Sequence, residues 1–336
     1  MDEEKRAYLS RLRAAMTEQA REAGEIARCV RYAEQLLRSD LPVLFDGTHV
    51  WQVLRMEHVD RNRYHSFNIS QGQKVRLITA PSRPLKARQR WILDVILSRL
   101  EVSPYAQGFE QARSIKTNAL IHARHDYVVC LDIRDYFPSI GQQAVFGVFY
   151  SAGYTVSAAS ALTGICCYGG ALPQGAPTSP RLSNIIFKEL DFQLAEIAEK
   201  YGAAYSRYAD DMTFSADCPL PGIVEEVSAL LAQHGFELNS EKTQFYGPGE
   251  PKEITGLVVQ NGTVRVPKAY RRLLKQEIYY CRKFGVLAHL ENRKSQHYVN
   301  YREHLYGKAY YVQMIEPGLG KHFLHELDQI KWPSYS

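Results

Sequence analysis

One twelve-residue run in the second half of the chain limits the possible folds most strongly. The run AYSRYADDMTFS (204–215) predicts two short β-strands joined by a tight Ala-Asp-Asp turn. This turn carries two adjacent carboxylates, Asp210 and Asp211. Asp is a common turn residue, so the pair has a structural interpretation as well as a functional one. Because neighbouring carboxylates repel each other, a site that must hold divalent cations gains more from this pair than a structural turn does.

Three further segments predict strands. The apolar run YVVCL (127–131) predicts a short buried strand that ends on a third carboxylate, Asp132. The run ITGLVVQNGTVRV (254–266) predicts a hairpin, because Asn261-Gly262 suits a type I′ turn between alternating β-branched residues. Another hairpin is predicted at 64–78, where two alternating runs flank a polar turn.

Helical periodicity alternates with these strands. One or two amphipathic helices are predicted over 3–38, and single helices over 86–100, 182–197 and 223–234. Gly235 follows the last of them, in the position of a left-handed C-cap. Helices that alternate with antiparallel hairpins favour an α+β fold over a doubly wound parallel sheet.

The composition is that of an ordinary globular chain. Its 336 residues are 45% hydrophobic and 23% charged, and their number suits two domains or one elongated unit with several subdomains. No apolar stretch approaches the ~18 residues of a membrane span, and the charged start MDEEKRAYLSRLRAAM lacks the apolar region of a signal peptide. We therefore expect a cytoplasmic protein with no membrane partner. The six cysteines form no CxxC pair, so reduced thiols are expected rather than disulfides or a zinc site.

Positive charge is concentrated towards the C-terminal end. From Gly262 to Ser336 the chain has 13 Lys and Arg against 6 Asp and Glu, whereas the preceding 261 residues carry a net charge of −2. Twelve aromatic residues lie in the same stretch. Basic residues interleaved with tyrosines suit a nucleic-acid surface, where cations neutralise phosphates and rings stack on bases or sugars. A solvated basic helix over a tyrosine-rich core is the alternative.

Four motifs follow one another through the middle of the chain. They are LDIRDYF (131–137), LPQGAPTSPRLSN (172–184), YADD (208–211) and NSEKT (239–243). The phosphate-binding GxxxxGK[ST], nucleophile-elbow GxSxG and zinc-binding HExxH motifs do not occur in the sequence. In order and spacing the four motifs resemble the palm motifs of reverse transcriptases, over roughly residues 64–283.

Two shorter boxes narrow the resemblance. NALIH (118–122) resembles the NAxxH box of bacterial retron reverse transcriptases, and ITG (254–256) resembles their VTG box with Ile in place of Val. The wording GAPTSPxLSN is also typical of retron and retron-like enzymes. The sequence therefore resembles a retron-type RNA-directed DNA polymerase. A group II intron-like reverse transcriptase is the nearer alternative, against which stand the NALIH box and the expected lack of a maturase extension.

The resemblance implies a right-hand polymerase with fingers, palm and thumb, an antiparallel palm sheet and an N-terminal helical segment. The implied limits are 1–45 for the N-terminal helical segment, 46–125 for the fingers, to which 141–180 also contributes, 126–260 for the palm and 261–336 for the thumb. The basic, Tyr-rich stretch would then coincide with the thumb.

The resemblance also implies a role for individual motif residues. Asp132, Asp210 and Asp211 would hold two Mg²⁺ ions, with Asp211 the more peripheral ligand. Phe137, five residues beyond Asp132, matches the bulky gate that rejects a ribose 2′-hydroxyl. Lys242 matches a lysine suspected of protonating the departing pyrophosphate. For an isolated Phe or Lys, a core aromatic and a surface charge are the ordinary interpretations.

Nucleotide contacts are implied at four other positions. Gln174 and Gly175 would lie against the incoming nucleotide, where glycine allows a close approach of the backbone. Arg76 matches the residue that holds the triphosphate, and Lys74 is a second candidate. Arginine suits this role because its guanidinium pairs with phosphate through two hydrogen bonds.

The expected RNA contacts fall into two sets. Asn118 and His122 lie four residues apart, on one face if the segment is helical, and would contact RNA or brace the palm. The helix expected over 268–283 would turn its apolar residues inward, Leu273 among them, and leave its cations to face phosphate. The cations expected to bind RNA include Lys268, Arg271, Arg272 and Lys275.

The implied function is synthesis of a branched RNA–DNA molecule, msDNA. Such an enzyme would use Mg²⁺ and dNTPs to copy part of a structured noncoding RNA into a short single-stranded DNA, primed from a 2′-hydroxyl of an internal guanosine. The expected partners are that RNA, the DNA product, an effector protein for defence against phages, and a host ribonuclease H that removes the template. An alternative of another class is a polymerase-fold RNA–protein scaffold within a toxin–antitoxin complex.

Overall fold

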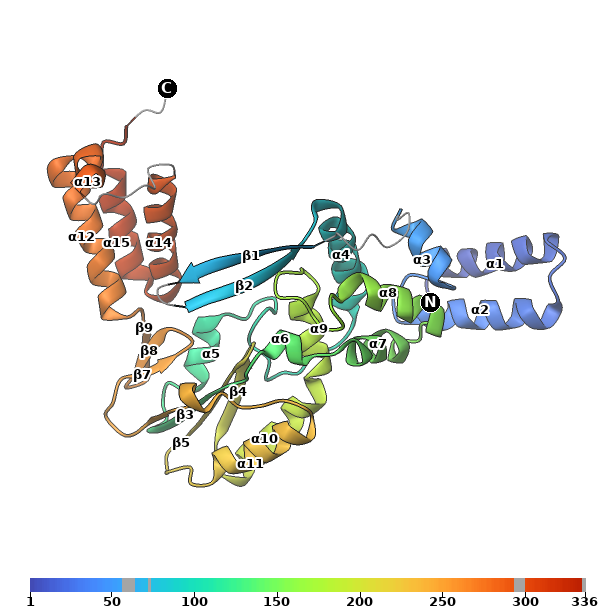
Figure 1. Ribbon diagram of the computed structural model, residues 1–336, viewed down its shortest axis with the longest axis horizontal. Coiled ribbons are helices and arrows are strands. Elements are labelled where there is room, and N and C mark those ends of the chain that lie inside the picture. The colour runs from blue at the N-terminus through green and yellow to red at the C-terminus, as the bar shows by residue number, and fades with distance from the viewer. Residues whose placement is uncertain (56–63, 72–73, 293–299, 334–336) are drawn as a thin grey trace.

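A computed structural model describes residues 1–55, 64–71, 74–292 and 300–333 of the chain. The molecule is elongated, with a helical hairpin at one end, a central body that contains the largest sheet, and a group of C-terminal helices at the other end (Figure 1). Helices and antiparallel sheets occur together, so the α+β prediction is confirmed. Among the helices in these described ranges, none is long and apolar enough to cross a lipid bilayer.

The central sheet has four antiparallel strands in the order β4-β5-β3-β6. Strands β4 (Ala204–Tyr208) and β5 (Asp211–Ala216) form the predicted hairpin, and β3 (Tyr127–Asp132) is the predicted apolar strand. The short edge strand β6 (Gln244–Tyr246) pairs with β3. The register pairs Asp132 with Asp211, so the ends of the two middle strands carry facing acidic residues.

Helices cover one face of this sheet. α9 (Ser179–Ile186) and α10 (Lys188–Lys200) precede β4, and α11 (Ile223–Gln233) follows β5 and lies along α10 (Figure 1). The prediction of one helix over 182–197 was wrong in one respect, because the helix is broken at Phe187, whose buried ring packs against those of Tyr136 and Phe236. Gly235 has φ +78° after α11, as its predicted C-cap role requires.

A second group of elements lies beside the sheet. The predicted hairpin is present as β1 (Tyr64–Gln71) and β2 (Lys74–Pro81). The helix predicted over 86–100 is α4 followed by one 3₁₀ turn. The helices of this part are α3 (Gly47–Val53), α4 (Arg83–Val95), α5 (Ile115–Ile121), α6 (Tyr136–Ser139), α7 (Gln142–Ser151) and α8 (Val156–Cys166).

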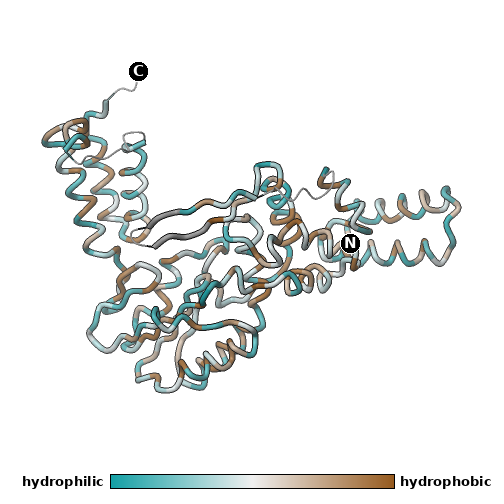
Figure 2. The backbone as a smooth tube through the Cα atoms, in the orientation of Figure 1, coloured by the Kyte–Doolittle hydropathy of each residue, from teal (hydrophilic) through white to brown (hydrophobic). Residues whose placement is uncertain are grey.

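The N-terminal helices α1 (Glu3–Glu18) and α2 (Ala23–Arg38) form a hairpin that projects from the body (Figure 1). None of the residues of α1 is buried, and the outer part of the hairpin is mostly hydrophilic (Figure 2). By contrast, α2 buries Val30, Ala33 and Leu36, and Leu36 joins the main core. The hairpin is therefore attached to the body through the C-terminal half of α2.

The C-terminal part begins with a three-stranded antiparallel sheet, β7 (Lys252–Ile254), β8 (Leu257–Gln260) and β9 (Thr263–Arg265). Asn261 and Gly262 have φ values of +49° and +73°, as the predicted type I′ turn requires. In the described part of 268–333, four helices follow, which we call the C-terminal bundle. They are α12 (Lys268–Phe284), α13 (Val286–Asn292), α14 (Tyr301–Ile315) and α15 (Pro317–Asp328).

Two hydrophobic cores hold the described residues together. The larger core contains residues between Leu36 and Leu231, from the central sheet and from the helices that pack around it. The smaller joins the three-stranded sheet to the C-terminal bundle, and Ala119 and Ala123, from the α5 region, belong to it. The C-terminal part is therefore packed directly against the segment that carries the NALIH box.

Candidate active site

The strand register brings the three predicted carboxylate residues to one end of the central sheet. Asp132 is the last residue of β3 and lies opposite Asp211, the first residue of β5. Asp210 precedes Asp211 in the turn, and its carbonyl accepts a hydrogen bond from the amide of Ile133 at 3.1 Å. This hydrogen bond fastens the turn to the end of β3. Acidic residues almost 80 positions apart in the sequence thus share one edge.

Asp210 and Asp211 lie in a turn formed by residues 208–211, which we call the YADD turn. The backbone of this turn is strained, and the turn is tightly packed. Ala209 has φ +58°, a left-handed conformation that costs free energy in a residue with a side chain. The loop at Gly108 packs against it so closely that a Cβ on Gly108 would lie 2.9 Å from the amide nitrogen of Ala209. Only glycine fits at this contact. Surrounding packing therefore holds the turn in place.

One oxygen of Asp132 has the environment of a cation ligand. The Asp132 side chain is buried; its Oδ2 accepts a hydrogen bond from Lys242 Nζ at 2.5 Å, while its Oδ1 has no protein partner among the described residues. A buried carboxylate oxygen without a donor is costly unless a cation or water satisfies it. Both Asp132 and Asp211 line a cavity of about 430 Å³, together with Glu241 and Lys242.

The donor set fits a metal that is completed by its substrate. Within the described ranges, no group of three or more His, Cys, Asp or Glu side chains forms a ready-made metal site. Mg²⁺ in phosphoryl-transfer sites is commonly bound by only one or two carboxylates together with substrate phosphates and waters. The orphaned Asp132 oxygen, the facing Asp211 and the open cavity meet that requirement.

Phe137 lies near the carboxylates on the one-turn helix α6 and is half-buried. Its ring centroid is 5.4 Å from that of Tyr136 and 6.4 Å from that of Phe109. Phe109, which the motifs did not indicate, is half-exposed and has φ +66°. A bulky residue in this conformation is unusual, but the sequence carries no sign of it.

Gln174 and Gly175 lie against strand β2. The Gln174 carbonyl accepts a hydrogen bond from the amide of Thr79 at 2.9 Å. Gly175 has φ +137°, and a Cβ at this position would lie 2.9 Å from the Thr79 carbonyl oxygen, so a glycine is required. Lys74 and Arg76 belong to the same strand as Thr79, but their side chains lie outside the described part of the structure.

The two polar residues of the NALIH box are inside the protein, whereas Leu120 and Ile121 are exposed. Asn118 and His122 are both 0% exposed. The two ring nitrogens of His122 lie 2.7 Å from the hydroxyls of Ser206 on β4 and Ser215 on β5. The Ser206 hydroxyl donates to Asn118 Oδ1 at 2.6 Å, so it accepts from the Nε2–H of His122. Because both side chains are buried, the structure corrects the prediction that Asn118 and His122 contact RNA. Their hydrogen bonds match the alternative prediction, in which these side chains brace the central sheet.

This network continues to the ITG box. Asn118 Nδ2 donates to Thr255 Oγ1 at 3.5 Å, and Thr255 has φ +46° in the turn between β7 and β8. Burial lowers the pKa of His122 to about 3, so the imidazole is neutral near pH 7. The two boxes that narrowed the sequence resemblance are therefore in contact, although 137 positions separate Asn118 from Thr255.

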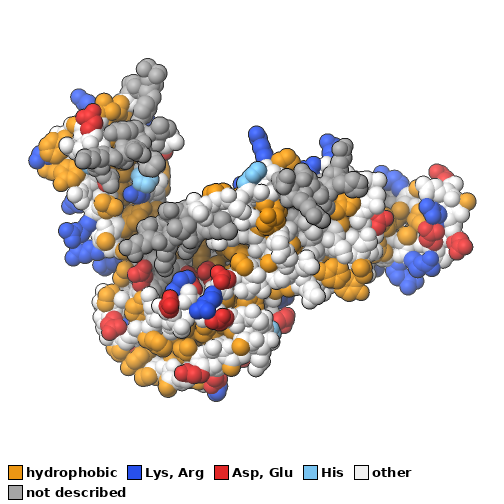
Figure 3. Space-filling model, in the orientation of Figure 1, with side chains coloured by type: hydrophobic (Ala, Val, Ile, Leu, Met, Phe, Trp, Pro, Cys, Tyr) orange, Lys and Arg blue, Asp and Glu red, His pale blue; other side chains and the backbone are white. Residues whose placement is uncertain are grey.

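The basic residues of α12 are not equivalent. Lys268, Arg272 and Lys275 are exposed. Lys and Arg side chains gather on the visible face of the bundle near the central body (Figure 3). Arg271 is half-buried, and its Nη1 lies 3.4 Å from Glu316 Oε2 on the loop before α15. Leu273, predicted to pack inward, is 44% exposed, which corrects that prediction.

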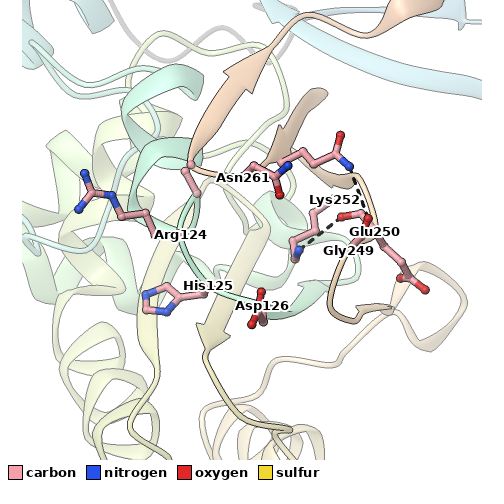
Figure 4. A pocket seen from close by; sticks show the side chains of 10 residues that line it. Arg124, His125, Asp126, Gly249, Glu250, Lys252 and Asn261 are labelled. Atoms are coloured by element: carbon pink, nitrogen blue, oxygen red, sulfur yellow. Dashed lines mark hydrogen bonds between the residues drawn. The ribbon is translucent and has the colours of Figure 1, made fainter.

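A second cavity, of about 340 Å³, lies at the opposite end of β3 from Asp132 (Figure 4). Arg124, Asp126 and Lys252 line it, and Lys252 Nζ donates to the Glu250 carbonyl at 3.3 Å. Its wall mixes basic and acidic side chains, and none of the three predicted carboxylates contributes to it. This cavity is therefore separate from the candidate active site.

The chain is similar to one known protein family and to several known proteins. Residues 69–259 match the family model described as "Reverse transcriptase (RNA-dependent DNA polymerase)". The chain is 37% identical to the Retron Ec86 reverse transcriptase of Escherichia coli over 68% of this chain and 73% of that protein. It is 36% identical to the Retron Mx65 reverse transcriptase of Myxococcus xanthus over 72% of this chain and 59% of that protein. Among solved structures, a foamy viral protease-reverse transcriptase covers 83% of this chain and 42% of its own, at 12% identity and a TM-score of 0.44.

The chain belongs to the reverse transcriptases, the RNA-dependent DNA polymerases. Within that family it is of the retron type, as its similarity to several retron enzymes shows. Its activity is RNA-directed DNA synthesis, its fold is that of a right-hand polymerase, and enzymes of this family use divalent metal ions. An RNA template and a DNA product are therefore its nucleic-acid partners.

The burial of His122 generates a pH prediction. Its folded pKa, about 3, is below the ordinary value of 6.5, so the unfolded chain binds more protons between these pH values and stability is lost as pH falls. From pH 6.5 to 4.5 this histidine should remove on the order of 1.4 kcal/mol of unfolding free energy per pH unit. Denaturant unfolding at several pH values should show a smaller decrease for His122→Gln. Equal pH slopes for the two proteins would contradict the neutral, buried assignment.

Proposed function

We propose that this enzyme copies part of a structured noncoding RNA into a short single-stranded DNA that stays joined to the RNA through a 2′-hydroxyl of a guanosine. Its product, msDNA, would act with an effector protein in defence against phages, and a host ribonuclease H would remove the copied template. The observation that carries the polymerase part of this proposal is the facing pair Asp132 and Asp211 beside an open cavity. Similarity to retron reverse transcriptases supports the msDNA part.

The carboxylates are proposed to hold two Mg²⁺ ions. Asp132 and Asp210 would bind both ions and Asp211 would be the more peripheral ligand. When bound, such ions activate the attacking hydroxyl and stabilise the leaving oxygen in phosphoryl transfer. Lys242, whose ammonium already contacts Asp132, is proposed to donate a proton to the departing pyrophosphate. Its half-exposed side chain leaves it free to reach a substrate in the cavity.

The incoming deoxynucleotide is proposed to lie between α6 and the Gln174–Gly175 loop. The half-buried ring of Phe137 would lie under the sugar and exclude a 2′-hydroxyl by size. Gly175 would allow the backbone to approach the nucleotide. Arg76 and Lys74, on the strand that contacts this loop, are proposed to hold the triphosphate.

The domain limits are proposed as the resemblance of the sequence implies them. We assign 1–45 to an N-terminal helical segment, 46–125 with 141–180 to the fingers, 126–260 to the palm and 261–336 to the thumb. The thumb is proposed to hold the cognate RNA through exposed cations of α12. Arg271 contributes less to this surface, because Glu316 already pairs with its guanidinium.

The metal assignment is tested by replacing Asp210 with Asn. Asp210→Asn should reduce DNA synthesis on an annealed primer–template by about 10³-fold or more, because the metal ions that stabilise the developing charge lose a ligand, while RNA affinity and folding stay near wild type. Thermal stability without metal should rise slightly, since like charges no longer repel. As a matched control, Asp217→Asn removes an exposed carboxylate just beyond the far end of β5 and should leave synthesis unchanged. Near wild-type synthesis by Asp210→Asn would refute the site.

The sugar gate is tested at Phe137. Phe137→Val should open space beneath the 2′-carbon and improve incorporation of ribonucleotides relative to deoxynucleotides by about tenfold or more. Single-nucleotide incorporation with matched dNTP and rNTP measures the ratio. Phe192→Val, at a half-exposed ring on α10 outside the site, is the control. An unchanged ratio in Phe137→Val would make this ring a packing residue only.

The RNA surface is tested with the double variant Arg272→Gln/Lys275→Gln. Each lost phosphate contact should lower the slope of log K against log salt by about 0.7 to 0.9, so the double variant should bind the cognate RNA more weakly and with a flatter salt dependence. Lys321→Gln/Lys331→Gln removes two exposed cations that lie outside α12 and serves as control. Extension of a simple primer at low salt should change little. Equal affinity and slope would move the RNA surface elsewhere, first to the Arg-rich N-terminal helices.

A further inference from the structure

A buried ion pair lies directly next to the YADD turn. Arg207 on β4 and Asp191 on α10 are both 0% exposed. Arg207 Nε donates to Asp191 Oδ1 at 2.8 Å, and Nη2 donates to Oδ2 at 2.7 Å, so the guanidinium and the carboxylate meet through two parallel hydrogen bonds. The Tyr205 hydroxyl also donates to Asp191 Oδ1, at 2.8 Å. The carboxylate is therefore held in one orientation.

The remaining edge of the guanidinium faces the YADD turn. Arg207 Nη1 donates to the carbonyl of Ala209 at 3.1 Å. Ala209 is the left-handed residue of the turn, and its carbonyl carbon is bonded to the amide nitrogen of Asp210. The same nitrogen of Arg207 also lies within hydrogen-bonding distance of the Tyr136 hydroxyl, at 2.9 Å, and of Asn184 Oδ1, at 3.2 Å.

Neighbouring side chains leave the guanidinium little freedom. Its central carbon lies 4.4 Å from the centroid of the Phe187 ring, which occupies the break between α9 and α10. On its amide side Ala209 is confined by the loop at Gly108, whose carbonyl accepts from Asn184 Nδ2 at 2.8 Å. The strained residue is thus held through its carbonyl by Arg207 and packed at its amide by Gly108.

Stability alone is a poor explanation for this arrangement. A buried ion pair loses the hydration of both charges, and well-packed apolar residues of similar size often replace such a pair without loss of stability. What apolar residues cannot supply is a donor to the Ala209 carbonyl. A turn that must present two repelling carboxylates needs that kind of support, because small displacements of reacting groups cost large factors in rate.

We propose that Arg207, oriented by Asp191, is a positioning residue for DNA synthesis that fixes the YADD turn through the Ala209 carbonyl. It touches neither substrate nor metal in this arrangement and acts through the backbone that carries Asp210 and Asp211. This inference rests on the proposed function of those carboxylates. It explains why a charged residue occupies a fully buried strand position two residues before the turn's left-handed residue.

The test is the double variant Asp191→Leu/Arg207→Met, which removes both charges and keeps apolar volume. Steady-state synthesis on poly(rA) primed with oligo(dT) should show kcat lower by about 10²-fold, with KM for dTTP and affinity for the primer–template within a factor of about three. Circular dichroism should show a folded protein whose melting temperature is close to that of the wild type. An isolated fall in kcat with intact folding is not expected from a residue that only supports the core.

Arg207→Lys provides a second variant that keeps the buried charge but lacks the fork that reaches both Asp191 and Ala209. Its kcat should fall by about tenfold or more at unchanged KM. As a control for buried pairs in general, Glu277→Gln disrupts the Glu277–His289 contact of 2.8 Å in the C-terminal bundle. It should lower the melting temperature and leave kcat per folded molecule unchanged.

The outcomes separate this inference from the proposed function. In one outcome, Asp210→Asn is inactive but both Arg207 variants keep wild-type kcat, or lose kcat only in proportion to the fraction of unfolded protein. This outcome overturns the positioning role of Arg207 and leaves the carboxylate site standing. If the double variant does not fold, Arg207→Lys decides by the same criterion. If Asp210→Asn is itself active, the proposed site fails first.

Discussion

Two acidic residues face each other across neighbouring strands at one end of the central sheet, and the register between β3 and β5 puts them there. Because side chains alternate along a strand, a slip of one residue would send Asp132 to the opposite face of the sheet. Like charges at this spacing oppose the pairing that brings them together. The register must therefore be fixed by contacts elsewhere in the sheet, and much of the surrounding structure serves this requirement.

Polar networks on both faces of the sheet fix the strand register. Ser206 and Arg207 are consecutive on β4, so their side chains point to opposite faces. Ser206 meets His122 and Asn118 on the side of α5, and Arg207 meets Asp191 on the side of α10. Buried polar groups are unfavourable unless their hydrogen bonds are made, so each network tolerates only one arrangement of its strands. Specific register is what such networks provide and apolar packing does not.

The sequence predicted much of this fold because its signals were local. The three predicted hairpins, the apolar strand before Asp132 and the C-cap at Gly235 depend on residues within a few positions of one another. The break at Phe187 could not be predicted, since the apolar spacing continues through it and only tertiary packing of its ring reveals the change in direction.

The candidate site likewise has a part that the sequence predicted and a part that depends on contacts between distant residues. Three carboxylates could be named from motifs, but their approach depends on long-range strand pairing. Partners distant in the sequence also decided which cations were exposed, as the pairing of Arg271 with Glu316 illustrates. The burial of Asn118 and His122 could not be predicted because their serine partners lie 84 to 93 positions away. Spacing could put them on one helical face without indicating whether that face met solvent or strand.

Ala119 and Ala123 belong to the smaller core, which is otherwise formed mainly by the C-terminal part. This affects how the chain packs while the ribosome synthesises it. Apart from Val128, the other buried residues of that core begin at Ile254, about 130 positions later in the sequence. At about 5–20 residues per second, α5 waits on the order of ten seconds for its partners. During that time its apolar side lacks the surface that covers it in the finished protein. The C-terminal part thus completes the packing of a helix near the middle of the chain. A chain cut short before residue 254 would keep the contact of α5 with β4 but leave Ala119 and Ala123 without most of their core partners.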